Sequence, residues 1–421
     1  MQPSGAPPPP TLIYLALNDW FSSTRLPRYL SRAGFRLVAV CTPASPLLQV
    51  RHFEHRAVIA PEDLTSTLEE VTKRFQPKLI VSADEGAIYA VHALQQQCAT
   101  APATISTALR ALVRRSLGNP EQQHHMLRKQ RINEIAGGLG IAVPRQRAIT
   151  LPREADAFAR EVGYPIVLKK ENTHGGMGVL LCRNAAETVT SVFRLRAIGI
   201  PRRGIAKYGV GTLAHIAPLR SLLGAWRGQP LIAQEYVQGT PAFRTFVARE
   251  GRVLAGFSAV AERVNPPPFG SSTVVRFVDN PNMARAVAAL AEAVGITGFA
   301  GVDFILEARS NRAVLLELNA RVTPTNHLGS LLGTDLCAAL MAELTDDREI
   351  ASARPPNALP VLRTVALFPS ELMRDAASEY LVSAYHDIPE DEPELIAAWR
   401  TGLPQCAHWL RSIPLLSIAD T

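Results

Sequence analysis

Long apolar runs are absent from this chain of 421 residues. No stretch of about 18 uninterrupted apolar residues occurs, which argues against a membrane-spanning helix. Residues 1–10 lack the basic and apolar regions of a signal peptide and are rich in proline, so we interpret them as a disordered tail. A cytoplasmic location is the corresponding expectation.

Cysteine is scarce and forms no metal-binding pattern. The five cysteines are far apart in the sequence, and no C-x-x-C spacing occurs. Free thiols in a reducing compartment are the simplest interpretation, which agrees with a cytoplasmic location. The cysteines are Cys41, Cys98, Cys182, Cys337 and Cys406.

Aromatic residues make up only 6% of the chain, and no nucleic-acid-binding motif is present. The net charge of +7 favours an anionic partner. Nucleotides and carboxylates satisfy that charge as well as nucleic acid does, and the missing motif makes nucleic acid the weaker choice.

The first part of the chain alternates between strand and helix patterns. Short apolar runs at 11–17, 35–41 and 78–82 predict buried strands, and the segments 22–34 and 61–75 between them predict helices. This alternation predicts a Rossmann-like domain with a parallel sheet over about residues 11–117. Ligands bind at the carboxyl ends of such strands.

Three acidic residues follow these strands. Asp19 follows the first strand, and Asp84 with Glu85 follows the third. Helix capping is the preferred interpretation, because a carboxylate at a helix start accepts hydrogen bonds from free N–H groups. Contact with a substrate is the alternative.

The following part, residues 118–345, mixes helices with hairpins and predicts an α+β domain of two lobes, the smaller being a lid over about 160–237. Its predicted elements are helices at 126–139, 151–162 and 284–294, a strand at 231–237, and hairpins at 166–169/179–181, 243–248/253–259 and 301–306/313–318. Proline becomes frequent after this part, so residues 346–421 are predicted to be a C-terminal appendage.

One long segment, 188–234, contains no Asp or Glu. Within it, apolar residues from Leu213 to Trp226 follow helical spacing and predict an amphipathic helix. A lid over an anionic substrate is one interpretation, and a solvated insertion is another. A third is a surface for a membrane or for an acidic carrier protein.

The strongest chemical pattern lies in the last predicted hairpin. Glu317 and Asn319 alternate along one strand and point to the same face, which Asp303 on the partner strand can also reach. Two carboxylates and an amide oxygen suit Mg²⁺, with Mn²⁺ as an alternative, held together with phosphate oxygens. Arg321 can neutralise phosphate nearby. A charged, solvated strand end is the alternative interpretation.

Two further segments favour a nucleotide. Lys169 ends a strand and is followed by the glycine-rich turn 174–178, whose backbone N–H groups can approach phosphates. The segment 234–239, with Glu235 and Val237, ends another strand and offers free backbone groups to adenine. Taken alone, each segment is only a turn.

In this order the segments resemble the ATP-grasp superfamily. Lys129 precedes G-I-x-x-P, Lys169 ends P-φ-φ-φ-K, and E-Y-V-x-G and D…E-x-N-x-R follow, over about residues 11–345. The resemblance implies ATP and Mg²⁺ as cofactors. It implies phosphate contacts from the two lysines, adenine contacts from the hinge, a metal site and an arginine on the γ-phosphate. The implied residues are Lys129, Lys169, His174, Gly175, Gly176, Met177, Gly178, Glu235, Tyr236, Val237, Asp303, Glu317, Asn319 and Arg321.

The sequence departs from the family pattern after the hinge. Many members place an acidic residue there for the ribose hydroxyls, whereas Thr240-Pro241-Ala242 stands here, so another group must bind the ribose. Arg276 lies on a predicted strand in a region where members often hold a substrate-binding or phosphate-binding arginine, and a surface ion pair is the alternative.

The resemblance implies a ligase that joins a carboxylate to an amine, or less often a thiol, through an acyl phosphate. The carboxylate and amine are small molecules, with amino acids as the default class, and family members are often homodimers. Two alternatives stay open: a kinase that phosphorylates a small molecule, and an ATP-binding module without catalysis.

Overall fold

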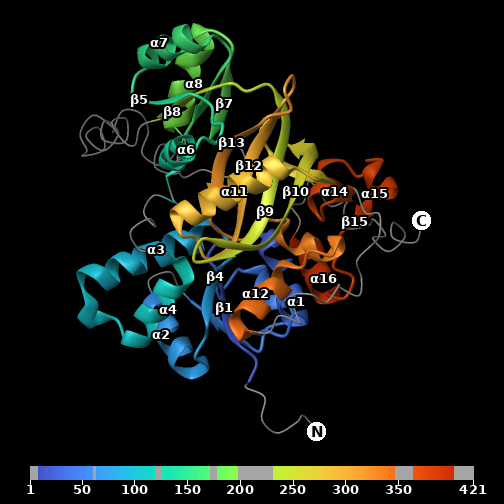
Figure 1. Ribbon diagram of the computed structural model, residues 1–421. Helices are drawn as coiled ribbons and strands as arrows, with labels where there is room; N and C mark the ends of the chain where they lie inside the picture. Colours follow the sequence, from blue (N-terminus) through green and yellow to red (C-terminus); the bar gives the residue numbers. More distant parts are fainter. Residues whose placement is uncertain are drawn as a thin grey trace, which may run out of the picture.

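The computed structural model describes residues 8–59, 63–118, 126, 128–170, 178–197, 231–346 and 364–402. These residues form three β-sheets with helices on their faces. Figure 1 shows the N-terminal unit in blue and cyan, the small lid sheet in green, and the large central sheet in yellow and orange between them. The predicted mixture of a parallel α/β unit and an α+β fold is confirmed.

The N-terminal unit contains a parallel sheet in the strand order β3-β2-β1-β4. One predicted helix differs: residues 22–34 form a 3₁₀ turn, Phe21–Thr24, and then a short helix, because Pro27 has no backbone N–H and starts a new first turn. The elements are β1 (Thr11–Ala16), α1 (Pro27–Arg32), β2 (Arg36–Cys41), β3 (His55–Val58), α2 (Leu64–Phe75), β4 (Leu79–Ser82), α3 (Glu85–Thr100) and α4 (Thr107–Leu117).

The lid sheet is antiparallel in the order β5-β8-β6-β7. The predicted hairpin around the glycine-rich turn is confirmed, since β6 pairs with β7 from Ile166↔Cys182 to Lys169↔Val179. The predicted helix 213–226 and residues 171–177 of the turn lie outside the described residues. The elements are β5 (Gln146–Ile149), α7 (Pro152–Val162), β6 (Ile166–Lys169), β7 (Val179–Cys182), α8 (Ala185–Ala197) and β8 (Leu231–Glu235).

The central sheet has the order β13-β12-β9-β10-β11-β14-β15, and its two faces pack against different partners. Side chains alternate, so Phe246 faces the helices α6 and α11, whereas its neighbour Val247 faces α12 and the N-terminal unit. The elements are α6 (Lys129–Gly138), β9 (Gly239–Arg249), β10 (Arg252–Asn265), β11 (Ser271–Val278), α11 (Pro281–Val294), β12 (Gly298–Glu307), β13 (Ala313–Asn319) and α12 (Leu336–Thr345).

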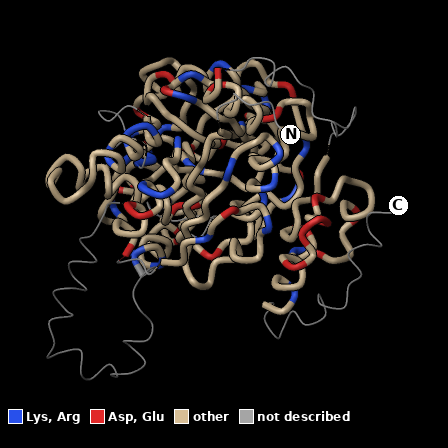
Figure 2. Tube along the Cα trace, turned by 90° about the horizontal axis from the view of Figure 1, so that it is seen from below, with Lys and Arg blue, Asp and Glu red and all other residues tan. Residues whose placement is uncertain are grey.

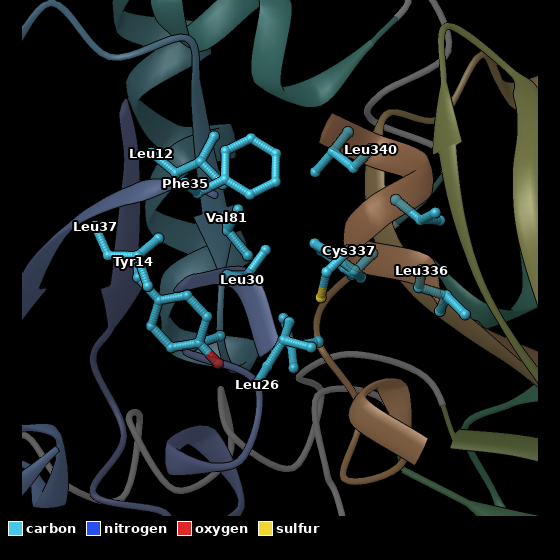
Figure 3. Packing of buried hydrophobic residues seen from close by; sticks show 14 of the residues in the cluster. Leu12, Tyr14, Leu26, Leu30, Phe35, Leu37, Val81, Leu336, Cys337 and Leu340 are labelled. Carbon is cyan, nitrogen blue, oxygen red and sulfur yellow. The ribbon is translucent and has the colours of Figure 1, made fainter. Parts of the chain in front are cut away.

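A shared hydrophobic core joins the N-terminal unit to the central sheet. Figure 3 shows Tyr14 and Leu30 of the N-terminal unit opposite Leu336 and Leu340 of α12, and all four side chains are at most 1% exposed. Replacing one buried leucine by alanine in such a core costs roughly 2–5 kcal/mol. The core therefore fixes the carboxyl ends of the parallel strands relative to the central sheet.

The C-terminal segment, predicted as an appendage, extends the central sheet. Its strand β14 (Thr364–Ala366) pairs with β11, and β15 (Tyr385–His386) pairs with β14. Asp387 then contacts both the N-terminal unit and the segment after β13: its carboxylate lies 3.5 Å from Arg25 and 2.8 Å from His327. The helices of this segment are α14 (Ser370–Arg374), α15 (Tyr380–Ser383) and α16 (Pro393–Gly402). The predicted domain boundaries stay predictions.

Within the described ranges, no single helix is long and apolar enough to cross a membrane, although the bent pair 326–332 and 336–345 meets the criteria of length and composition. Figure 2 shows Lys and Arg interspersed with Asp and Glu along the trace.

Candidate active site

A cavity of about 350 Å³ lies where the three sheets meet. The start of α3 contributes to it from the N-terminal unit, β6 and the end of β8 from the lid, and β9, β12 and β13 from the central sheet. Figure 1 shows the lid above the central sheet and the N-terminal unit below it. The predicted site residues that line this cavity are Lys129, Lys169, Glu235, Tyr236, Val237, Asp303, Glu317, Asn319 and Arg321.

Two carboxylates face each other across neighbouring strands of the cavity wall. Asp303 on β12 and Glu317 on β13 are directly paired in register, so their side chains lie on the same face. The Asn319 amide donates a hydrogen bond of 2.9 Å to Asp303 Oδ2. Like charges opposite each other destabilise a sheet. This pair therefore needs positive charge close by.

Lys129 supplies part of that charge. It is the first residue of α6, and its Nζ lies 2.7 Å from Glu317 Oε2. Burial alone would raise the pKa of Glu317, but Lys129 and Lys169 lower it to about 2. Burial raises the pKa of Asp303 to about 7, and the charge of Glu317 adds to that shift. Asp303 is thus the carboxylate whose charge is least compensated.

Lys169 ends β6 and faces the same carboxylates from the lid side. Burial lowers the pKa of its ammonium to about 8, while Glu317 opposes that shift and Lys129 reinforces it. The charged form of a lysine is unfavourable when the lysine is desolvated beside another lysine. An anion that enters the cavity therefore stabilises that charged form.

Arg321 connects the metal-site strand to the N-terminal unit. Its guanidinium forms an ion pair with Glu85, the first residue of α3, and donates a hydrogen bond of 2.9 Å to the Val322 carbonyl. Within the described part of the chain, Arg321 Nε and Glu85 Oε2 are buried without hydrogen-bond partners. The pair therefore leaves one donor and one acceptor for a ligand.

The hinge is the chain between the lid and the central sheet. β8 ends at Glu235, and β9 of the central sheet begins at Gly239, so Tyr236 to Gln238 form the connection. The Glu235 N–H donates to the Arg145 carbonyl over 2.8 Å, which occupies that donor. The Glu235 side chain pairs with Arg145 at 3.1 Å. The Glu235 N–H is therefore not available to a ligand.

The donor set fits Mg²⁺. Two carboxylates and an amide oxygen are hard ligands, and Mg²⁺ in proteins commonly takes one or two carboxylates together with phosphate oxygens and water. Burial first, and then the charge of Glu317, raise the pKa of Asp303 by disfavouring its ionised form, and a divalent cation beside it would favour that form. Among the described residues, no group of three or more His, Cys, Asp or Glu that could hold a metal ion is present.

Comparison with known proteins agrees with this geometry. Residues 140–325 match the family model of an ATP-grasp domain, and solved structures of biotin carboxylases share the fold. Residues 140–325 thus form an ATP-grasp domain, and the chain shares the ATP-grasp fold.

A curated relative is the large chain of carbamoyl phosphate synthase from Thermus thermophilus, which is 24% identical over 338 residues. The match covers 76% of this ATP-grasp chain but only 29% of that protein. The chain therefore spans less than a third of the length of this relative.

Two solved structures illustrate the shared fold. The biotin carboxylase domain of Hydrogenobacter thermophilus 2-oxoglutarate carboxylase, solved with Mg·ADP and bicarbonate, aligns with a TM-score of 0.56 and 16% identity, covering 79% of this chain and 68% of that one. The L-amino acid ligase of Bacillus licheniformis aligns with a TM-score of 0.53 and 14% identity, covering 85% and 79%. At these identities both show the ATP-grasp fold alone.

Two described site predictions, Arg276 and Gly178, do not line the cavity. Arg276 lies on β11, is about half exposed, and pairs with Glu262 on β10. Its catalytic role stays a prediction. His174, Gly175, Gly176 and Met177 lie outside the described residues, and the Gly178 carbonyl accepts a hydrogen bond of 2.8 Å from the Lys170 N–H.

Asp84 caps α3, as expected. Its Oδ1 accepts a hydrogen bond of 2.8 Å from the Ala87 N–H, and its Oδ2 accepts bonds of 2.9 and 3.0 Å from Leu17 and Asn18. Asp19 accepts a hydrogen bond of 2.5 Å from the Thr42 hydroxyl and does not line the cavity. Because Asp84 caps α3, the next residue, Glu85, lies at the start of that helix beside Arg321.

Several cavity residues were not predicted from the sequence. Tyr89 lies one helical turn after Glu85, so the spacing i, i+4 could have indicated it once Glu85 was placed. Others are neutral residues that no chemical pattern in the sequence marks, among them Met126, Ser271, Ser272, Thr323 and Thr325.

Proposed function

We propose that this chain is an ATP-dependent ligase that joins a small carboxylate to an amine, or less often a thiol, through an acyl phosphate, releasing ADP and phosphate. The observation that carries the proposal is the pair Asp303 and Glu317, facing Lys129 and Lys169 across one cavity. Carboxylates and ammonium groups that share one cavity suit a ligand that carries both a metal cation and a polyphosphate.

The two lysines are proposed to bind phosphate oxygens of ATP. Lys129 pairs with Glu317 at 2.7 Å, and a nucleotide phosphate would compete for its ammonium. Lys169 is desolvated, with a pKa lowered to about 8, and an anionic phosphate beside it would stabilise its charged form. The backbone of Glu235 and Val237, next to Tyr236, would hold adenine, and the loop from His174 through Gly175, Gly176 and Met177 to Gly178 would close over the phosphates.

Asp303, Glu317 and Asn319 would hold Mg²⁺, which supplies neutralisation of the triphosphate charge when it is bound. The protein contributes the fixed position of these oxygens. Asp303 and Glu317 are held by direct strand pairing, and Asn319 is oriented by its hydrogen bond to Asp303. Preorganised groups of this kind need little rearrangement during reaction.

Arg321 is proposed to stabilise negative charge on the transferred phosphoryl group. In the first step, a carboxylate oxygen of the substrate attacks the γ-phosphorus, and the bond to ADP breaks. In the second, the amine nitrogen attacks the acyl carbon, and phosphate leaves with the bonding electron pair. Arg321 already binds one carboxylate, Glu85, so a substrate carboxylate is a chemically equivalent partner for it.

The test begins with phosphate release from Mg·ATP in the presence of pooled amino acids and small carboxylates. Hydroxylamine should yield a hydroxamate, because it captures an acyl phosphate. Phosphorylation of an added compound without a hydroxamate would favour the kinase instead. Nucleotide binding without turnover on any pool would favour a non-catalytic module.

A matched pair of variants locates the chemistry. Glu317→Gln should abolish Mg²⁺-dependent ADP binding and reduce turnover at least about 100-fold. Glu307→Gln removes the same charge from the same hairpin but does not line the cavity, and it should behave as wild type. Equal effects of the two changes on ADP binding would overturn the proposal. The homodimer, the acidic carrier protein and the cytoplasmic location stay predictions.

A further inference from the structure

A second cleft lies between the N-terminal unit and the central sheet. It measures about 820 Å³ and shares no lining residue with the nucleotide cavity. The strands place it at the opposite side of the fold: Lys78 directly precedes β4, whereas Glu85 follows that strand, and Arg249 ends β9, whereas Gly239 begins it. The lining residues are Gln76, Pro77, Lys78, Arg115, Arg249, Glu250, Arg252, Glu343 and Leu344.

The cleft carries more positive than negative charge. Four of its lining residues are Lys or Arg and two are Glu. The two carboxylates are already occupied, since Arg252 pairs with Glu343 at 2.5 Å and Arg249 pairs with Glu250 at 3.6 Å. In the described part of the chain, no carboxylate lies within ion-pair distance of Lys78 or Arg115. Two positive charges are therefore left without a counter-ion.

The arginines are arranged unfavourably for an empty cleft. Burial lowers the pKa of Arg115, and the charge of Arg249 lowers it further. Arg115 Nε donates to the Lys78 carbonyl at 3.4 Å. Arg249 is 19% exposed, and its Nη1 is buried without a hydrogen-bond partner among the described residues. Burying such a donor destabilises the folded state unless an acceptor reaches it.

We propose that this cleft binds a small dianion, a phosphate monoester or a dicarboxylate, between Lys78, Arg115 and Arg249. Two surplus positive charges match a dianion, and the planar guanidinium forks of two arginines match phosphate or carboxylate oxygens. The ligand joins α4 and the start of β4 in the N-terminal unit to the β9–β10 turn of the central sheet. Binding therefore stabilises the two units together.

The inference does not depend on the nucleotide site or on the ligase reaction. An anion bound at Lys129 and Lys169 is the main competing explanation of any anion effect, so the experiment has to locate the bound ion. Arg114 provides a matched control, because it precedes Arg115 in α4 and is exposed as Arg115 is, but does not line the cleft.

The test is a titration of the full chain with inorganic phosphate and, separately, with malonate, in Mg²⁺-free buffer and against sodium chloride at equal ionic strength. Calorimetry gives the affinity, and thermal unfolding gives the stabilisation. Wild type and Arg114→Gln should bind at least one of the two dianions with the same affinity. Arg115→Gln should bind it at least tenfold more weakly. Binding of phosphate alone identifies a phosphate ligand, and binding of malonate identifies a dicarboxylate ligand.

Two further readouts separate a binding role from a structural one. Without added dianion, Arg115→Gln should unfold at the temperature of wild type or above it, because a repulsive contact is removed. Hydrogen exchange in wild type should slow at residues 76–78, 111–117 and 249–252 when the dianion is added. Stabilisation no greater than that by chloride, equal affinity of the two variants, or protection confined to 301–321 would each overturn the inference.

Discussion

Replacing Asp303 by asparagine should make the ligand-free protein more stable while destroying Mg²⁺-dependent nucleotide binding. The carboxylate faces Glu317 directly across two strands, and its pKa is raised to about 7 by burial and by that neighbour. Asparagine removes the charge, keeps the shape, and can still accept the hydrogen bond from Asn319.

The magnitude follows from the pKa shift. A rise from the ordinary value of 3.8 to about 7 corresponds to about 4 kcal/mol of lost stability once the group is ionised. The side chain borders an open cavity, and solvent there screens the charge, so about 2 kcal/mol is the expected gain of Asp303→Asn near pH 8. Because the folded state holds the proton more tightly, wild type loses this stability as pH rises from about 4 through about 7. The advantage of the variant should therefore shrink by roughly half or more at pH 5.

The assay is urea unfolding at pH 8 and pH 5 without Mg²⁺, repeated at pH 8 with Mg·ADP. Asp279→Asn is the control, since it removes the same charge from an exposed position. With Mg·ADP, wild type should be more stable than Asp303→Asn, because a ligand that binds only the folded wild type stabilises it by mass action. An Asp303→Asn variant that is less stable than wild type at pH 8 without metal, or equally stabilised by Mg·ADP, would refute the reasoning.

Three further predictions concern other sites. Burial lowers the pKa of His92 to about 4, so its contribution to stability is complete above about pH 6.5 and falls by about 2–3 kcal/mol as pH drops towards 4.5. In urea unfolding, His92→Leu should lose less unfolding free energy than wild type over this pH range. Parallel plots of unfolding free energy against pH for the two proteins would contradict the burial argument. Gly239→Ala places a Cβ 2.1 Å from the Leu306 carbonyl oxygen and should cost more than about 2 kcal/mol in thermal unfolding, whereas Gly138→Ala, with no atom within 4 Å, should cost nothing. Lys129→Met leaves Glu317 without its 2.7 Å partner and should weaken ADP binding, measured by calorimetry, at least about tenfold. Lys73→Met is the control and should bind ADP as wild type does. An unchanged affinity of Lys129→Met for ADP would show that Lys129 does not bind phosphate.

Strand pairing in the site was predictable because it is local. Asp303 and Glu317 belong to one hairpin, so alternation along the chain was sufficient to place both on one face. The motif around Lys169 was readable for the same reason, since β6 and β7 are also consecutive.

Features that depend on an irregular register or on distant contacts were not predictable, and one local helix break was missed. The direction of Arg276 depends on the register of β11 against β10, which shifts between Ala261 and Val264, and no local pattern marks that irregularity. The pairing of β14 with β11 joins residues about 90 positions apart, and its three residues carry no strand signal of their own. Pro27 marks the helix break in the sequence, but the prediction of one helix over 22–34 followed the apolar spacing around this proline instead.

The contact between Arg25 and Asp387 has a consequence for folding during synthesis. Arg25 is only 7% exposed, and the carboxylate that neutralises its guanidinium is 362 residues later in the chain. A nascent N-terminal unit would have to bury this cation unpaired or leave it hydrated, so its final packing has to wait until Asp387 leaves the ribosome. The turn around Arg25, although translated early, is thus among the last parts of the chain to reach its final packing.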